Sequence, residues 1–278
     1  MATVAYGMAR RGHAVAFTYD PRGPVGDRLD AIVERVPVRI RNDADPTALL
    51  RLRRLIFRSR ADVVVVNTAR ELRVGGFAAR LARRAAVVNR RGAGDVLREA
   101  PLDRWLQHAL IDVLVRDSRW GVQAIGARNP WFRRPVFQAR NGIDGAAVAR
   151  TAPMERATFG AGREEFVIVV SDRAGRPAGA PDVAAAGRRV VEAMPGADIH
   201  IVVIGAVEPA TVDRTMRTVA GAKGVRASFL GPRPPGEALS IMAAADIFAR
   251  PSSSDGIPYA ALEAMALGLP IVATATAG

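Results

Sequence analysis

The sequence predicts an α/β protein with two successive domains, each built on a parallel β-sheet that helices cover on both faces. Two observations lead to this prediction. Short, continuous β-branched runs recur along the chain, and such runs are typical of strands in parallel sheets buried on both faces. Segments with apolar residues at helical spacing separate them. The alternation occurs twice, before and after a turn-rich connector over residues 141–162, so we expect a domain boundary near residue 150.

The first half opens in a helical segment, residues 4–11, that passes through Gly12 and His13 into a strand. Residues 47–59 (TALLRLRRLIFRS) repeat apolar residues at helical spacing, with arginines between them. This pattern predicts an amphipathic helix whose arginines point outward. The strands expected in this half cover residues 15–18, 36–40, 63–66, 85–88, 113–116 and 136–138.

The second half contains a predicted helix over residues 183–194, which stops at Pro195. Another helix is expected from about Pro258 to Leu267, because proline is favoured in a first helical turn and Gly268 provides a stop. The strands expected in this half cover residues 167–170, 199–204, 227–230, 247–249 and 271–273.

Composition narrows the chemistry that the chain can perform. The absence of cysteine excludes disulfides, thiolate zinc sites and cysteine nucleophiles, and three scattered histidines do not favour a transition-metal site. The longest aliphatic runs have the length of strands, so no membrane-spanning helix is expected. The first twenty residues lack the apolar core of a secretory signal, and we therefore expect a cytoplasmic protein.

The net charge of +13 is concentrated in the first half of the chain. Residues 1–150 hold 28 arginines against 14 acidic residues, whereas residues 151–278 hold 11 arginines and Lys223 against 13. A basic half beside a neutral one favours contact with anionic lipids, acidic glycans or nucleic acid. It is equally compatible with a solvated arginine-rich surface.

The stretch 250–274 (RPSSSDGIPYAALEAMALGLPIVAT) is the most informative part of the sequence. A polar loop precedes a helix there, and the free amides of a first helical turn form a ready phosphate site. Glu263 lies in a nearly all-apolar helix, where an unpaired carboxylate is costly and therefore needs partners. Two interpretations remain open: Asp255 or a neighbouring serine caps the helix while Glu263 pairs with a core arginine, or both acids bind ligand hydroxyls.

This stretch resembles the signature of the family 4 glycosyltransferases, retaining enzymes of the GT-B type. In that signature an acidic residue and a glutamate eight positions apart flank a Gly-x-Pro turn, and Asp255 and Glu263 match them. The resemblance implies that Asp255 binds hydroxyls of a donor sugar and Glu263 the nucleotide ribose. It also implies two Rossmann-like, doubly wound domains facing a cleft, with the acceptor domain in residues 1–150 and the nucleotide-sugar donor domain in 151–278.

Further positions of the second half resemble the donor site of the family. Arg173 and Gly179 match residues that hold the donor diphosphate, whereas Ala178 replaces a lysine whose charge Arg176 would supply. Gly205 matches a strand end that lines the base pocket. The implied donor-binding residues are Arg173, Arg176, Gly205, Ser254, Asp255, Gly256, Ile257, Pro258 and Glu263, with Asp255 and Arg173 as the catalytic ones.

Residues 36–144 resemble acceptor domains that act on lipopolysaccharide-type glycans, through the motifs Arg90-Arg91-Gly92 and Asn141-Gly142-Ile143-Asp144. The expected acceptor-side residues are Arg91, Gly92 and Asn141. Compared with the family, the opening strand with its glycine-rich loop and the final strands and helices are missing. The resemblance therefore implies a chain truncated at both ends, with both domains incomplete.

The implied function is transfer of a sugar from a UDP- or GDP-sugar to a glycan or lipid-linked acceptor in lipopolysaccharide or polysaccharide biosynthesis. Neither a metal nor another cofactor is expected, and the protein would work in the cytoplasm with peripheral contact to the inner face of the plasma membrane. The alternative is a catalytically inactive, nucleotide-sugar-binding fragment. A basic nucleic-acid-binding protein would also explain the arginines, but no recognition helix or aromatic-basic signature is present.

Overall fold

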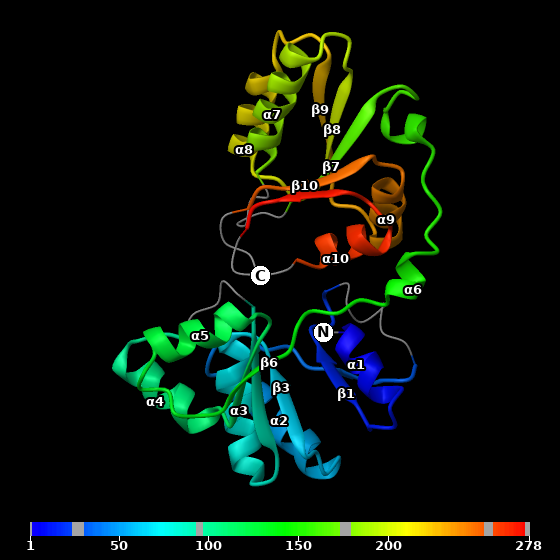
Figure 1. Cartoon of the computed structure of the whole chain (residues 1–278). Helices are drawn as coiled ribbons and strands as arrows, with labels where there is room; N and C mark the ends of the chain where they lie inside the picture. The colour runs from blue at the N-terminus through cyan, green and yellow to red at the C-terminus, as the bar shows by residue number, and fades with distance from the viewer. Residues whose placement is uncertain (1, 24–30, 93–96, 173–178, 253–257, 276–278) are drawn as a thin grey trace. The chain divides into compact units, whose positions relative to one another are not determined.

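The computed structural model describes residues 2–23, 31–92, 97–172, 179–252 and 258–275. The chain divides into two compact units, Met1–Arg140 and Asn141–Ala277 (Figure 1). This division falls before the boundary expected near residue 150. The reason is local packing, because α6 (Gly145–Val148) contacts α10 (Tyr259–Ala266) of the second unit.

The first unit is an α/β arrangement in which the expected strands form two parallel sheets among its described residues. β1 pairs with β2, and a separate sheet has the order β3-β4-β5-β6. The elements are α1 (Ala2–Ala9), β1 (Ala16–Tyr19), β2 (Glu34–Pro37), α2 (Pro46–Arg58), β3 (Val63–Val66), α3 (Ala69–Ala82), β4 (Ala86–Arg91), α4 (Pro101–Leu110), β5 (Val113–Arg116), α5 (Arg119–Arg128) and β6 (Val136–Gln138).

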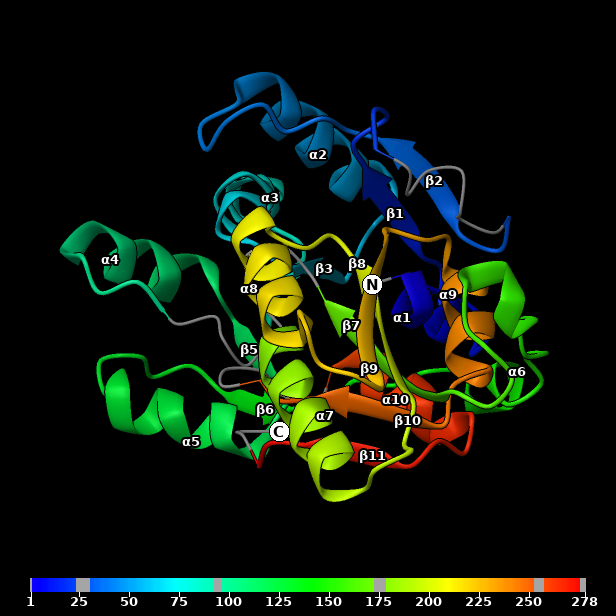
Figure 2. The same cartoon turned by 90° about the horizontal axis from the view of Figure 1, so that it is seen from above.

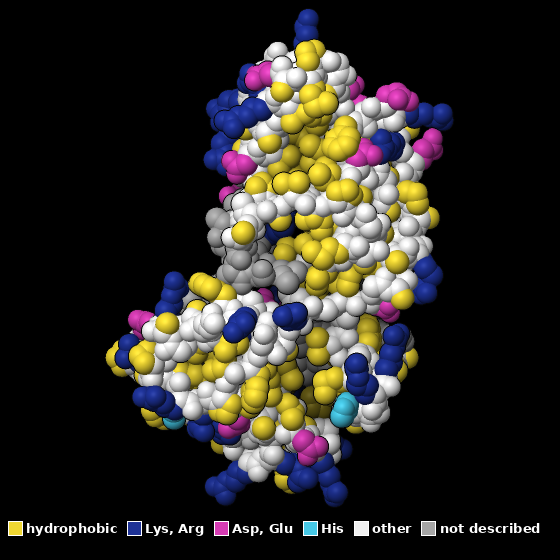
Figure 3. All heavy atoms as spheres, viewed as in Figure 1, with side chains coloured by type: hydrophobic (Ala, Val, Ile, Leu, Met, Phe, Trp, Pro, Cys, Tyr) yellow, Lys and Arg dark blue, Asp and Glu magenta, His cyan; other side chains and the backbone are white. Residues whose placement is uncertain are grey.

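Helix α2 confirms the amphipathic helix expected over residues 47–59. Asp45 caps its start, because its carboxylate accepts hydrogen bonds from the backbone amides of Thr47 and Ala48. Its apolar stripe, which includes Leu52 and Ile56, is buried in the core of the first unit. α2 and α3 lie side by side (Figure 2). Arginine side chains gather at the lower end of Figure 3, where Figure 1 draws these two helices.

The second unit contains one parallel sheet, among its described residues, with the order β11-β10-β7-β8-β9. The chain enters the sheet in its middle at β7, builds outward through β8 and β9, and returns to the other side of β7 for β10 and β11. The elements are α6, a 3₁₀ turn (Arg156–Phe159), β7 (Phe166–Asp172), α7 (Ala180–Ala193), β8 (Ile199–Gly205), α8 (Pro209–Val219), β9 (Val225–Gly231), α9 (Pro235–Ala243), β10 (Ile247–Arg250), α10 and β11 (Ile271–Ala273).

Both faces of this sheet are buried, which confirms the doubly wound fold predicted for the second half. Alternate residues of the strands face opposite sides. Val167 and Val169 belong to a core that includes residues of α9 and α10, whereas Val170 belongs to a second core that includes residues of α7 and α8. Within the described part of the chain, none of the helices has the length and apolar character needed to cross a membrane.

Candidate functional site

The order of strands in the second unit reverses between β7 and β10. In open α/β sheets ligands bind at such a reversal, in the crevice outside the carboxyl ends of the strands. Asp172 ends β7 and Arg250 ends β10, and both side chains are buried. Nη1 of Arg250 donates a hydrogen bond of 2.6 Å to the carbonyl oxygen of Ser171. Arg250 therefore brings a guanidinium to the strand ends that flank the reversal.

Gly205 ends β8 and pairs with Asp172 across the sheet. Its φ of +114° is unfavourable for any residue with a side chain, and a Cβ atom there would overlap the carbonyl oxygen of Asp172. The structure thus places this predicted donor-binding residue at the same sheet edge as Asp172. Glycine is required because the two strand ends approach each other closely.

Helix α7 begins at the same edge. Gly179, its N-terminal flanking residue, has a φ of +83°, and a Cβ atom there would overlap the carbonyl oxygen of Pro251, which directly follows β10. Within the described part of the chain, no side chain caps this end of the 14-residue helix. Pro181 has no amide hydrogen, and the amides of Asp182 and Val183 donate to the carbonyl oxygen of Gly179. What this N-terminus offers an anion is therefore the positive end of the helix dipole. Together with Arg250, it forms a position suited to an anion such as a diphosphate.

Helix α10 carries the predicted ribose-binding residue. The helix starts at Tyr259, so Pro258 is its N-terminal flanking residue and not part of the first turn as expected. Glu263 is partly buried, and the loss of hydration raises the pKa of its carboxyl group. Among the described residues no hydrogen bond or ion pair reaches this carboxylate, so the expected alternative of pairing with a core arginine is not found there.

The remaining predicted donor-site residues are Arg173, Arg176, Ser254, Asp255, Gly256 and Ile257, and they lie outside the described residues. They belong to the stretches 173–178 and 253–257, which connect β7 to α7 and β10 to α10. Both connections follow the two strands that flank the reversal. The roles assigned to these six residues stay predictions.

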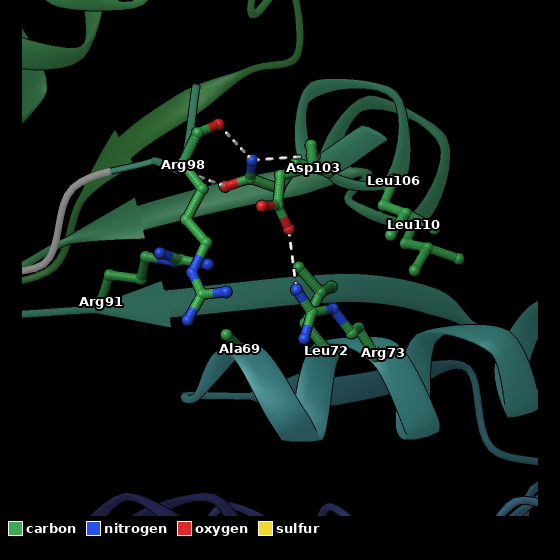
Figure 4. A pocket seen from close by; sticks show the side chains of 9 residues that line it. Ala69, Leu72, Arg73, Arg91, Arg98, Asp103, Leu106 and Leu110 are labelled. Carbon is green, nitrogen blue, oxygen red and sulfur yellow. Dashed lines mark hydrogen bonds and ion pairs between the residues drawn. The ribbon is translucent and has the colours of Figure 1, made fainter. Parts of the chain in front are cut away.

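On the acceptor side, the structure places Arg91 and Gly92 at the carboxyl end of β4. This strand continues past the expected residue 88 because Arg90 and Arg91 pair with β5. Nε of the buried Arg91 donates a 2.7 Å hydrogen bond to Oδ1 of Asn89. Arg91 lines a pocket together with Arg98 and Arg73 (Figure 4), whereas Asn141 does not line it.

This pocket combines three arginines with one carboxylate. Arg73 donates to Asp103 at 2.8 Å and also pairs with Asp43. The guanidinium of Arg98 has no carboxylate partner among the described residues. The pocket is lined by Ala69, Leu72, Arg73, Arg91, Arg98, Asp103, Leu106, Gln107 and Leu110, and its volume of about 10 Å³ is room for about one water molecule.

The sequence reasoning missed Arg250, although a local repeat could have indicated it. The pattern Asp-x-x-x-Arg-x-Ser occurs at residues 112–118 and again at 246–252. In each unit the carboxylate of the aspartate accepts a hydrogen bond from a backbone amide of the neighbouring strand. Asp112 accepts from Val87 N at 2.8 Å, and Asp246 accepts from Val167 N at 2.7 Å. In each unit the arginine ends a strand and is buried. A charged residue at the end of an apolar strand was the available signal.

Comparison with known proteins agrees with this arrangement. The family described as "Glycosyl transferases group 1" matches residues 167–278. A D-inositol 3-phosphate glycosyltransferase of Corynebacterium urealyticum is 35% identical over 97 residues, which cover 34% of this chain and 23% of that protein. The one from Nocardia farcinica is 29% identical over 143 residues, 48% of this chain and 32% of that protein. The chain thus spans less than a third of the length of several of these curated relatives.

Solved structures match almost the whole chain. Anabaena Alr3699/HepE, solved with UDP and glucose, superposes with a TM-score of 0.75 at 17% identity, covering 100% of this chain and 78% of that one. A glycosyltransferase from Rickettsia africae gives 0.77 at 14% identity, covering 99% and 74%. These likenesses confirm the predicted fold of two Rossmann-like domains of the GT-B type. Residues 167–278 thus match the group 1 family of glycosyl transferases, and the chain as a whole has the fold of the GT-B type.

Proposed function

We propose that the protein transfers a glycosyl unit from a nucleoside diphosphate sugar, bound by the second unit, to an acceptor bound by the first. The observation that carries this proposal is the anion position at the strand reversal, where the uncapped start of α7 lies against Pro251 and Arg250 reaches the end of β7. A diphosphate is the group that this combination of helix dipole and guanidinium suits best.

Positive charge at this position would assist the reaction itself. Cleavage of the anomeric bond expels a nucleoside diphosphate, so groups that stabilise developing negative charge on the leaving group lower the barrier. The positive end of the α7 dipole and Arg250 supply that stabilisation, together with Arg173 and Arg176. Transfer proceeds with retention of the anomeric configuration, and no metal and no protein nucleophile is part of the proposal.

Glu263 and Asp255 orient the donor. Glu263 is a partly dehydrated carboxylate without a partner among the described residues, and ribose hydroxyls would supply the missing hydrogen-bond donors. Asp255 binds hydroxyls of the transferred sugar. Both are assigned on the family signature in residues 250–274.

The acceptor binds the first unit and carries a phosphate. Support comes from the positive charges of Arg91 and Arg98, which lie close together in the first unit and match a phosphate in charge. A phosphate is present in lipid-linked glycan precursors and in the inositol phosphate that the curated relatives are named for. We place the reaction in lipopolysaccharide or polysaccharide biosynthesis, in the cytoplasm at the inner face of the plasma membrane. A catalytically inactive nucleotide-sugar-binding protein is the second candidate, because Ala178 replaces the lysine expected at the diphosphate.

The test is a calorimetric titration of the whole chain with UDP, GDP and uridine. We expect UDP or GDP to bind at least about tenfold more tightly than uridine, because the diphosphate contributes charge-assisted hydrogen bonds. Glu263→Gln should weaken nucleotide binding by about tenfold, the value of one strong hydrogen bond. Glu192→Gln removes a carboxylate near the far end of α7 and should leave binding unchanged.

Each outcome is informative. Nucleotide binding that is lost in Glu263→Gln, without hydrolysis or transfer from any sugar nucleotide, would favour the inactive protein. Failure of the folded chain to bind either nucleotide would rule out both candidates.

A further inference from the structure

Helix α2 has a second apolar stripe, which faces away from the core. Ala48, Leu52 and Ile56 form the buried stripe. Leu50 and Phe57, one heptad apart, lie on the opposite side, with 58% and 65% of their surfaces exposed.

Arginines surround this outer stripe on both sides. Residues 46–61 contain five arginines and no acidic residue. Arg54 lies on the outer face beside Leu50 and Phe57, whereas the others flank the stripe along the helix. The full set of arginines is Arg51, Arg53, Arg54, Arg58 and Arg60.

The end of α3 continues the same surface. Nε of Arg53 donates a hydrogen bond of 3.4 Å to the carbonyl oxygen of Leu81, which joins the two helices. Leu81 is 53% exposed, and the exposed Arg83 and Arg84 follow it. We call this set of residues the α2/α3 face: Leu50, Phe57 and Leu81, with the four arginines of α2, Arg60 just after it, and Arg83 and Arg84 after α3.

The charge of the α2/α3 face is not neutralised. Among the described residues none of its seven arginines forms an ion pair with a carboxylate. Other arginines of the first unit do form such pairs: Arg73 with Asp43 and Asp103, and Arg80 with Asp112. Repulsion between so many like charges is unfavourable unless a negatively charged partner is present.

We propose that the α2/α3 face docks on the surface of an anionic membrane. A helix lies in a membrane interface when it presents apolar side chains between basic ones, since the apolar groups enter the acyl boundary while the guanidinium groups reach the lipid phosphates. Leu50 and Phe57 between the arginines of α2 have this arrangement. A nucleic acid would make no use of the exposed apolar side chains of this face, since it attracts the arginines through its phosphates. A second copy of this chain would bring two arginine-rich faces together, and their like charges repel each other.

The experiment is co-sedimentation of the whole chain with vesicles of phosphatidylcholine, with and without phosphatidylglycerol. We expect binding only to the anionic vesicles, weakening as salt is added. Arg54→Glu/Arg58→Glu should weaken binding at least about tenfold, because each arginine near such a surface contributes about fivefold. Leu50→Ser/Phe57→Ser should also weaken binding without changing the charge.

Matched controls lie on α8 of the second unit. Arg214→Glu/Arg217→Glu changes the net charge equally at two exposed arginines, and Met216→Ser removes an apolar side chain that is 44% exposed. Both controls should bind vesicles as the unmodified chain does. Circular dichroism of each variant checks that α2 is intact, and the readout does not depend on nucleotide binding, so it can fail while the proposed function holds.

Three results would overturn the proposal. Equal binding to neutral and anionic vesicles would exclude charge recognition. Equal losses in the α2 and α8 charge variants would show attraction by net charge alone. DNA binding, or self-association, that is removed by Arg54→Glu/Arg58→Glu while vesicle binding persists would assign the face to another partner.

Discussion

Two glycines of the second unit show how a single missing side chain shapes the site. Gly179 lies directly before α7, and Gly196 lies between α7 and β8. Both have a left-handed backbone conformation, with φ of +83° and +98°. An alanine at Gly196 meets no atom within 4 Å, whereas one at Gly179 collides with Pro251. The two positions therefore share backbone strain and differ in the contact at the proposed diphosphate site.

We predict that Gly196→Ala lowers the free energy of unfolding by about 1 kcal/mol and leaves UDP affinity unchanged. Gly179→Ala should cost about 1 kcal/mol more and weaken UDP binding by about tenfold, since the start of α7 must move away from Pro251. Urea unfolding and calorimetric titration of both variants check this. Equal UDP affinities in the two variants would mean that the start of α7 is not part of the binding site.

Glu263 should show that a binding residue can reduce the stability of the unliganded protein. Burial raises the pKa of its carboxyl group, so its ionised form is less favourable in the folded chain than in the unfolded one. The contribution of Glu263 to stability is therefore present at a pH below its pKa in the unfolded chain. It is lost as the pH rises through its higher pKa in the folded chain.

We predict that Glu263→Gln raises the free energy of unfolding at pH 7 by about 1 kcal/mol, while it weakens nucleotide binding. The gain should shrink at pH 4, where the unmodified carboxyl group is increasingly protonated in both states. Urea unfolding at the two pH values measures it. A loss of stability at pH 7 would indicate that the carboxylate has a stabilising partner in the folded protein.

Three neighbouring strands of the second unit are joined at their amino ends by a polar network. Nη2 of Arg226 in β9 donates to Nδ1 of His200 in β8 at 2.9 Å. Arginine can only donate, so Nδ1 accepts and Nε2 carries the proton that it donates to Ser228 at 2.7 Å. Arg226 also forms two hydrogen bonds, of 2.5 and 2.6 Å, with Glu165 just before β7.

This network makes the fold sensitive to acid. Burial, with the charge of Arg226, lowers the pKa of His200 from 6.5 to about 4. Between these values the unfolded chain binds a proton that the folded chain does not, so stability falls as the pH falls. Hydrogen bonds from Arg226 lower the pKa of Glu165 from 4.5 to about 2, so its contribution is present above pH 4.5 and is lost below that.

We predict that the free energy of unfolding drops by about 2 kcal/mol between pH 6.5 and pH 5 because of His200. Urea unfolding of His200→Asn should show a much flatter pH dependence, whatever its absolute stability. His108→Asn changes an exposed histidine and should keep the steep dependence. If the slope survives in His200→Asn, another group is responsible for it.

Hydrophobic pattern placed β7 and β8 well, because a parallel strand buried on two faces must be continuously apolar. It was less accurate for β2, which covers Glu34–Pro37 where residues 36–40 were expected, because this strand is largely exposed and half polar. The ends of strands were also less predictable. β4 continues to Arg91 because β5 offers backbone partners as far as Arg116, and this partnership is a property of the folded sheet. The separate pairing of β1 with β2 likewise depends on contacts that no local pattern encodes.

Some residues of the candidate site could likewise be predicted from the sequence, and others depended on the fold. Glu263 could be selected from the sequence because a charged residue in an apolar helix is a local anomaly. The repeat that contains Arg250 marks it in the sequence, but its place beside the end of β7 follows from the strand order, since β7 and β10 are distant in sequence and adjacent in the sheet. Arg173, Arg176 and Asp255 lie outside the described residues, so for them the sequence remains the sole basis.

The whole molecule contains separate hydrophobic cores. One core consists of residues from the first unit, and two others, on the two faces of the β7–β11 sheet, consist of residues from the second. A unit with its own core can unfold as a cooperative block. We therefore expect thermal unfolding in two transitions, one for each unit, and each should respond to changes in its own unit only.

Two perturbations assign these transitions. Leu114→Ala removes a fully buried side chain from the core of the first unit, which should cost about 3 kcal/mol and lower one transition by several degrees. UDP at about one hundred times its Kd should add about 2.7 kcal/mol to the unit that binds it, and we expect it to raise the other transition. Scanning calorimetry measures both effects. If UDP raises the transition that Leu114→Ala lowers, the nucleotide binds the first unit or the two units unfold together, and the donor site must be reassigned or tested in the isolated units.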